Sequence, residues 1–132
     1  MTVLKKLLGA FFLIAGVTKI VPLLGYGYGF GGTVWFVDSM GYPMASTLVI
    51  LAIIAEIAGG VALLAPRFMD LCVLRQRLAA YGLAVFTVIA TVMFHVPGVA
   101  GETFVPELTQ VMKNIIIIAA LYAVGRSIKQ TA

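Results

Sequence analysis

The sequence predicts an all-helical membrane protein, a bundle of four transmembrane helices with both termini on the inner side. Of its 132 residues, 62% are hydrophobic and only 11% are charged, which is more apolar surface than a water-soluble domain of this size can bury. The apolar residues fall in runs of about 20, the length of a helix that crosses the hydrocarbon core of a bilayer. Four such runs fill the chain and leave room for one domain, residues 1–132.

The first expected span covers residues 3–24 and is closed by Pro22 and the glycines after it. Lys5 and Lys6 lie near its start, where lysine side chains extend toward the headgroups. Lys19, in contrast, lies inside the apolar run. Because the run has no small-residue cleavage site followed by a soluble region, we interpret it as an uncleaved span rather than a signal peptide.

Residues 25–44 form the expected outer loop, which is rich in glycine and aromatic residues. Gly27, Gly29 and Gly32 match G-x-G-x-x-G, but a dinucleotide site needs this motif between a strand and a helix of a βαβ unit. The all-helical pattern offers no such unit, so we reject the match. The aromatic residues suit the headgroup level, and residues 33–40 are expected to form a short interfacial helix.

The second expected span, residues 45–65, organises the rest of the chain because it carries one acid, Glu56, within an apolar run. A carboxylate at that depth costs about 2.5–3.5 kcal/mol to insert, so we expect it to face protein or water and to have a partner. Small residues on this span and on the first allow neighbouring helices to approach closely. These packing residues are Gly16, Ala55, Gly59 and Gly60.

The third expected span covers residues 78–96 and follows a loop that contains three arginines. Thr87, Thr91 and His95 are spaced i, i+4, i+8 and share one face. The simplest interpretation of the two threonines is that their hydroxyls bond to carbonyls of their own helix.

The fourth expected span covers residues 107–125, and a polar stripe at Gln110, Lys113 and Asn114 enters the membrane on one of its faces. Positive charges predict the orientation. With the N-terminus inside, the outer loops hold acidic residues and no lysine or arginine, whereas the inner segments hold the basic residues. These are Lys5, Lys6, Arg67, Arg75, Arg77, Arg126 and Lys129.

In this topology, polar residues from all four spans converge, most of them in the outer half of the bundle. We expect Glu56 to pair with Lys19, Lys113 or both, and His95 is a candidate proton relay because its charge changes near neutral pH. Two lysines against one carboxylate leave a positive charge. Asp38, a bound anion or a polarised carbonyl would balance it, unless burial leaves one lysine neutral. The candidate cluster is Lys19, Asp38, Glu56, His95, Gln110, Lys113 and Asn114.

Several classes of site are excluded by composition. One histidine, one cysteine and one nearby carboxylate are too few for a metal centre, and a single cysteine forms no internal disulfide. The net charge of +4 is scattered rather than arranged in a basic stripe, so no nucleic-acid partner is expected. The sequence has no flavin, haem or iron–sulfur ligand pattern, so we expect no intrinsic cofactor.

Five short motifs, taken with their order and spacing, carry a family resemblance: GAFFLIAGVTKI, GTVWFVDSMGYPM, AEIAGGVALL, TVMFH and KNIIIIAAL. They resemble the DoxX family of small four-span membrane proteins. The chain departs from the pattern at Ala65-Pro66, where the family usually has a glycine, and in the glycine-rich segment 26–31. Residues on the pattern include Lys19, Gly41, Pro43, Glu56, Gly59, Gly60, His95, Lys113 and Asn114.

The resemblance implies a multi-pass protein of the inner (plasma) membrane and leaves three functions open. Founding members are similar to a subunit of a thiosulfate:quinone oxidoreductase, and others are associated with oxidative-stress complexes. The first function is therefore a redox subunit or anchor, not an enzyme on its own. It would bind a soluble or peripheral oxidoreductase and hold a quinone head group near Lys19, Glu56 and His95. The second is binding or transport of a small solute, an anion or protons by an oligomer.

The third function is a structural or assembly module, in which the polar cluster only fixes how the helices pack. The small-residue faces suit self-association of the chain as well as packing within it.

Overall fold

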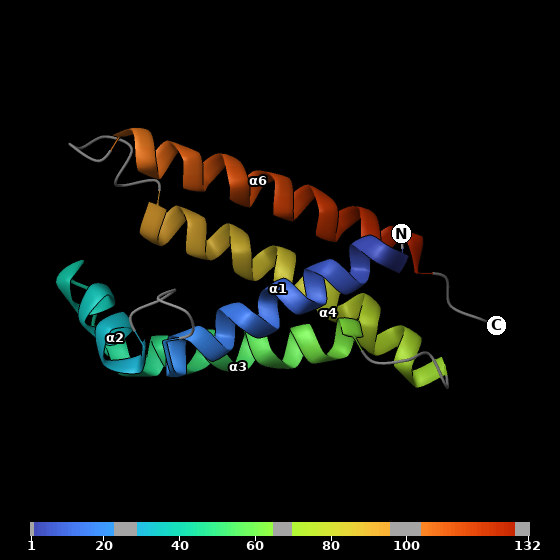
Figure 1. The fold of residues 1–132 in the computed structure, drawn as a ribbon, viewed down its shortest axis with the longest axis horizontal. Coiled ribbons are helices and arrows are strands. Elements are labelled where there is room, and N and C mark those ends of the chain that lie inside the picture. The colour runs from blue at the N-terminus through green and yellow to red at the C-terminus, as the bar shows by residue number, and fades with distance from the viewer. Residues whose placement is uncertain (1, 23–28, 65–69, 96–103, 129–132) are drawn as a thin grey trace.

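The computed structural model of the chain describes residues 2–22, 29–64, 70–95 and 104–128, which are helical apart from short turns (Figure 1). Over these ranges there is no strand, so the prediction of an all-helical chain is confirmed for them. The elements are α1 (Thr2–Ile20), α2 (Gly29–Ser39), α3 (Ala45–Leu64), α4 (Asp70–Ala90), the π-helix η1 (Thr91–His95) and α6 (Phe104–Ser127).

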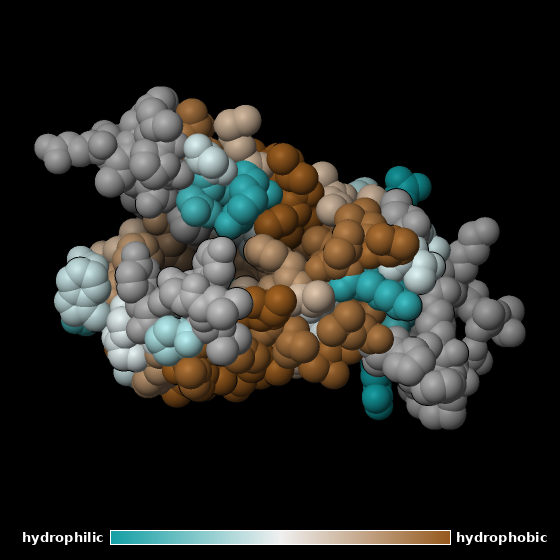
Figure 2. Space-filling model, viewed as in Figure 1, coloured by the Kyte–Doolittle hydropathy of each residue, from teal (hydrophilic) through white to brown (hydrophobic). Residues whose placement is uncertain are grey.

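Three of the described helices are long and apolar enough to cross a membrane. They are α3, the stretch Arg75–Phe94 of α4 and η1, and the stretch Leu108–Ser127 of α6. Helix α1 carries three lysines within 19 residues, more charge than any of these stretches. Figure 2 shows hydrophobic side chains over α3 and much of the middle of the molecule, as expected for a surface that lipid covers.

The helices pack as two close pairs. Helix α1 lies along α3, α4 lies along α6, and contacts between α3 and α4 join the pairs. The start of α1 and the end of α6 lie at one end of the bundle, and α2 packs against α3 and α1 at the other end (Figure 1). The two pairs approach each other less closely along α1 and α6.

Two apolar cores hold the bundle. The first gathers Leu8, Phe12, Leu63, Leu83, Leu121 and Val124 with their neighbours, from α1, α3, α4 and α6. The second gathers Val37 of α2 with Ala45, Val49 and Ile53 of α3. Each core consists of the apolar residues on the buried faces of its helices. Lys19, Glu56, Lys113 and Asn114 line a cavity whose wall includes residues of both cores.

Helix boundaries differ most from the expected spans at α1, α2 and α4. Helix α1 ends at Ile20 rather than near residue 24, because the proline at position 22 disfavours the helical conformation before it. Helix α2 begins at Gly29, four residues before the expected start. Gly29 has a φ of +67° and its carbonyl accepts a 2.6 Å hydrogen bond from the Thr33 hydroxyl, which closes the first turn.

The largest difference is at α4, which begins at Asp70 and not at residue 78. The arginines in this segment indicated a loop. Leucine, arginine and glutamine are all good helix formers, however, so the helix extends beyond its apolar part. Residues 70–77 are therefore the charged first turns of the third long helix.

Candidate functional site

An ion pair between α1 and α3 is the centre of the candidate site. The Lys19 ammonium lies 2.8 Å from both carboxylate oxygens of Glu56. The Glu56 side chain is 7% exposed and the Lys19 side chain is 29% exposed. Lys19 is therefore the lysine that holds Glu56, and it keeps one face open toward the space beside the pair.

Glycines set how closely α1 and α3 approach around this pair. A Cβ atom on Gly16, one turn before Lys19, would come 2.6 Å from a side-chain carbon of Ile57 and 3.3 Å from Glu56 Cβ. Gly60 faces the backbone of α1, and its neighbour Gly59 faces Leu83 of α4. The expected packing residues thus face two different helices, and Ala55 lines the cavity described next.

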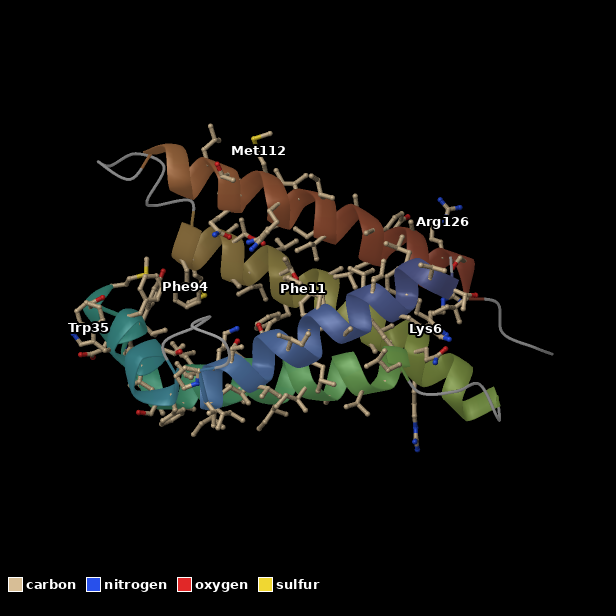
Figure 3. The ribbon with its side chains drawn as sticks, in the orientation of Figure 1. Lys6, Phe11, Trp35, Phe94, Met112 and Arg126 are labelled. Carbon is tan, nitrogen blue, oxygen red and sulfur yellow. The ribbon has the colours of Figure 1, made fainter. Side chains whose placement is uncertain are left out.

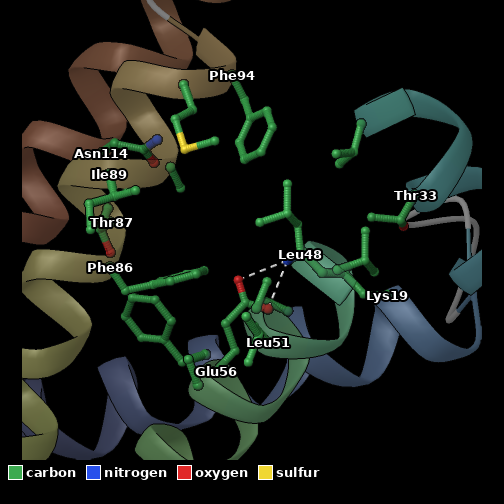
Figure 4. A pocket seen from close by; sticks show the side chains of 18 of the residues that line it. Lys19, Thr33, Leu48, Leu51, Glu56, Phe86, Thr87, Ile89, Phe94 and Asn114 are labelled. Carbon is green, nitrogen blue, oxygen red and sulfur yellow. Dashed lines mark hydrogen bonds and ion pairs between the residues drawn. The ribbon is translucent and has the colours of Figure 1, made fainter. Parts of the chain in front are cut away.

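A cavity of about 610 Å³ lies beside the ion pair, between the two helix pairs (Figure 4). Its wall is mostly apolar and includes five phenylalanines: Phe11, Phe12, Phe36, Phe86 and Phe94. Polar groups enter this wall from α1, α2, α3, α4 and α6. They are Lys19, Thr33, Glu56, Thr87, Lys113 and Asn114.

Asn114 of α6 is positioned by a chain of hydrogen bonds to α4 and η1. Its amide nitrogen donates to the Thr91 hydroxyl at 2.9 Å, and both groups are buried. The Thr91 hydroxyl donates to the Thr87 carbonyl, and the Thr87 hydroxyl donates to the Leu83 carbonyl. The interpretation of the two threonines as bonded to their own helix is therefore confirmed, and Thr91 also holds Asn114 against the cavity.

Lys113 lies next to Asn114 on α6, and its side chain is exposed. Its ammonium lies 5.9 Å from the centroid of the Phe11 ring of α1, in a cation–π contact between the two helix pairs. In the described part of the chain, the only ion pair is Lys19–Glu56. Two lysines and one glutamate therefore line the cavity, and when all three are ionised one positive charge is in excess.

The α2–α3 turn contacts η1, two of whose residues, Met93 and Phe94, line the cavity. The Tyr42 hydroxyl donates to the Met93 carbonyl of η1 at 2.7 Å, and the Tyr42 and Phe94 rings meet edge to face at 5.4 Å. Gly41, with a φ of +85°, makes the turn that brings Tyr42 to this position. This contact is not evident from the sequence, because it depends on the π-helix, which the helical periodicity does not indicate.

Two members of the expected cluster, Asp38 and Gln110, are not brought into the site. Asp38 is exposed on α2 and does not line the cavity, so it does not balance the excess positive charge. Its position on α2 directs it away because that helix buries Val37 instead. Gln110 is exposed on α6, one turn beyond Asn114 and outside the cavity lining. The side chain of His95, the last residue of η1, lies outside the described residues.

A second buried polar pair lies at the opposite end of the bundle. The Lys5 ammonium donates to the side-chain oxygen of Gln76 at 3.1 Å, and both side chains are buried. The expectation that Lys5 extends to the headgroups is wrong, because Gln76 lies on a helix turn and not in a loop, and so reaches α1.

Among the described side chains, no group of three or more histidine, cysteine or acidic residues is arranged to hold a metal ion. What the cavity offers instead is hydrogen-bond donors on an aromatic wall: two ammonium groups and the Asn114 amide. A mostly apolar wall with a few hydrogen-bond donors is the general form of a small-molecule pocket.

A family model described as DoxX matches residues 1–96, which is more than half of the chain. The chain belongs to the DoxX family. The match covers α1 to η1, and with them Lys19 and Glu56, whereas residues 97–132 lie outside it. The resemblance of KNIIIIAAL, which contains Lys113 and Asn114, is therefore not part of the matched region. No curated protein and no solved structure matches the chain.

Proposed function

We propose that this DoxX-family protein is a four-span subunit of a redox system in the inner (plasma) membrane, and that its cavity holds a quinone head group. Both termini lie on the inner side. The subunit serves a soluble or peripheral oxidoreductase and is not an enzyme on its own. The observation that carries the proposal is the aromatic cavity beside the Lys19–Glu56 pair.

Helix α1 as the fourth span is supported by its contacts. Its 19 residues give a helix of about 28 Å, close to the thickness of the hydrocarbon core. It packs along α3, which is itself long and apolar enough to cross a membrane. Two of its three lysines have protein partners, Lys19 at Glu56 and Lys5 at Gln76, and this lowers the cost of placing them in a span.

The size and wall of the cavity fit a quinone head group. Ligand pockets usually enclose about 300–1,000 Å³ and combine a mostly apolar wall with a few polar groups. The cavity here has about 610 Å³, and its phenylalanines offer faces on which a flat ring can stack. When bound, a quinone would supply the two-electron chemistry.

The polar residues of the wall supply donors for the carbonyl oxygens of such a ring. The Lys19 ammonium has three donors and shares them with two Glu56 oxygens, so it retains a donor for the cavity. Lys113 approaches from α6, on the other helix pair. The two lysines therefore enter the cavity wall from different helix pairs, and each can donate to a carbonyl oxygen of a quinone ring.

Replacing Lys113 by methionine is expected to lower the quinone content of the purified protein by about tenfold, because a hydrogen bond from a charged donor is lost. The full chain is purified in a mild detergent, and quinone per protein is measured by extraction and mass spectrometry. The matched control is Lys6→Met, which removes the same charge from an exposed site on α1. Loss of quinone from both variants alike, or a wild type without quinone, would count against the proposal.

Anion binding is a second candidate, and one observation favours it. The cavity lining holds two ammonium groups and one carboxylate, and this excess positive charge attracts a small anion as well as a carbonyl oxygen. The same extraction separates the two candidates. If an organic acid, and no quinone, is recovered from the wild type and lost from Lys113→Met, the anion is the ligand.

A further inference from the structure

At the end of the bundle away from the cavity, α4 and α6 carry the same two residue types in mirrored order. Arg77 precedes Tyr81 by four residues on α4, and Tyr122 precedes Arg126 by four residues on α6. The helices are antiparallel, since residue 114 contacts residue 91 and Gly125 lies against Tyr81. The mirrored order therefore places both arginines toward the end of the bundle and both tyrosines one turn deeper.

The four side chains make one continuous row across the two helices. The guanidinium carbon of Arg77 lies 5.9 Å from the centroid of the Tyr81 ring, and that of Arg126 lies 5.9 Å from the Tyr122 ring. The two tyrosine rings are 6.0 Å apart. A Cβ atom on Gly125 would come 2.7 Å from the Tyr81 ring. The absence of a side chain at Gly125 therefore allows the Tyr81 ring to pack closely against α6.

The arginines beside these rings keep N–H donors available for a ligand. A guanidinium group that lies over a ring uses its face, whereas its N–H donors lie in its plane and match two oxygens of a phosphate. No described carboxylate pairs with Arg77 or Arg126. Figure 3 shows Arg126 projecting outward at the end of the bundle where Lys6 also lies.

Apolar surface continues from this row toward the middle of both helices. Leu78 and Val85 on α4 and Ile115 on α6 are exposed large hydrophobic residues. Arg77 and Arg126 lie near the ends of the stretches Arg75–Phe94 and Leu108–Ser127, where a membrane-spanning helix meets the headgroups. A basic row at the headgroup level above an apolar helix face has the two parts that a phospholipid requires.

We propose that Arg77, Tyr81, Tyr122 and Arg126 form a binding site for an anionic phospholipid, whose phosphate lies at the arginines and whose acyl chains lie along α4 and α6. The tyrosines fix the arginines in place. This site is separate from the cavity and does not depend on the proposed quinone function.

The test measures lipid retention by native mass spectrometry of the full chain from nanodiscs of mixed phosphatidylglycerol and phosphatidylcholine. We expect the wild type to retain phosphatidylglycerol in preference to phosphatidylcholine. Each arginine near a membrane surface contributes a factor of roughly five, so Arg77→Gln/Arg126→Gln is expected to lower retention by about 25-fold. Arg75→Gln is the matched control, because Arg75 is exposed near the same helix end but makes no described contact with the tyrosines.

Other outcomes would overturn the site. Equal retention of phosphatidylglycerol and phosphatidylcholine by the wild type would show that the site does not select an anionic lipid. A loss in Arg75→Gln as large as the loss in Arg126→Gln would mean general attraction to a charged surface. Binding of inorganic phosphate as tight as that of the lipid would show an anion site without the acyl contacts. Because Arg126 is exposed, Arg126→Gln alone, with an expected fivefold loss, gives the answer if the double variant does not fold.

Discussion

Lys19→Met is expected to destabilise the folded chain by about 3–5 kcal/mol, because it leaves the Glu56 carboxylate without its partner inside the bundle. The side chain that remains is only 7% exposed, so water is a poor replacement for the lost ammonium. Glu56→Gln is expected to cost less. It leaves the Lys19 ammonium, whose side chain is 29% exposed, and the amide oxygen of glutamine still accepts a hydrogen bond.

The double variant Lys19→Met/Glu56→Gln is expected to recover part of the loss, since no charge is then left unpaired. The free energy of unfolding of all variants is measured by denaturation of the full chain in mixed micelles, followed by circular dichroism. Lys6→Met is the control, because an exposed lysine on the same helix is expected to change stability by less than about 0.5 kcal/mol. If Lys19→Met were no less stable than Lys6→Met, the ion pair would not hold α1 to α3.

Gly60→Ala is expected to destabilise the chain by about 1–3 kcal/mol, although alanine is the better helix former. The added Cβ atom would lie 2.7 Å from the Gly9 carbonyl oxygen and 2.7 Å from the Leu13 amide nitrogen. Both are backbone atoms, which no side-chain rotation moves away. Helices α1 and α3 must therefore separate, and this also lengthens the contact between Lys19 and Glu56.

Gly82→Ala is the matched control for this substitution. Gly82 is exposed within α4, and a Cβ atom there would meet nothing within 4 Å. Only the backbone effect remains, so a stabilisation of about 0.5–1 kcal/mol is expected from the same unfolding measurement. A Gly60→Ala variant as stable as Gly82→Ala would mean that the two helices do not approach as closely as the structure has them.

Residue patterns indicated the features that depend on one helix at a time. The apolar runs gave α3 and most of the other long helices, and small residues marked where helices approach closely. A lone acid in an apolar run indicated that Glu56 needs a partner, and the structure supplies Lys19. The partner of Glu56 could be narrowed to two lysines from the sequence, because these were the only lysines expected near its depth in the membrane.

Features that depend on the relative position of two helices cannot be predicted from the sequence of either helix alone. The bond from Asn114 to Thr91 requires the register between α4 and α6, and the bond from Lys5 to Gln76 requires that α4 begins at Asp70. The residues around Lys5 do not indicate whether its side chain extends to the headgroups or turns into the bundle, because both arrangements suit a lysine at the end of an apolar run. The cavity cannot be predicted from the sequence either, because its shape depends on how the helices of the two cores are placed relative to one another.

Filling the cavity without changing its charge is the most direct test of the proposed ligand site. Ala52 of α3 lines the cavity, whereas Ala58 of the same helix is exposed and does not. The binding of a short-chain benzoquinone to the full chain in lipid nanodiscs is measured by titration calorimetry for the wild type, Ala52→Phe and Ala58→Phe. We predict saturable binding to the wild type and to Ala58→Phe, and at least tenfold weaker binding to a folded Ala52→Phe. Equal binding by all three, or no binding by any, would contradict a quinone site in this cavity.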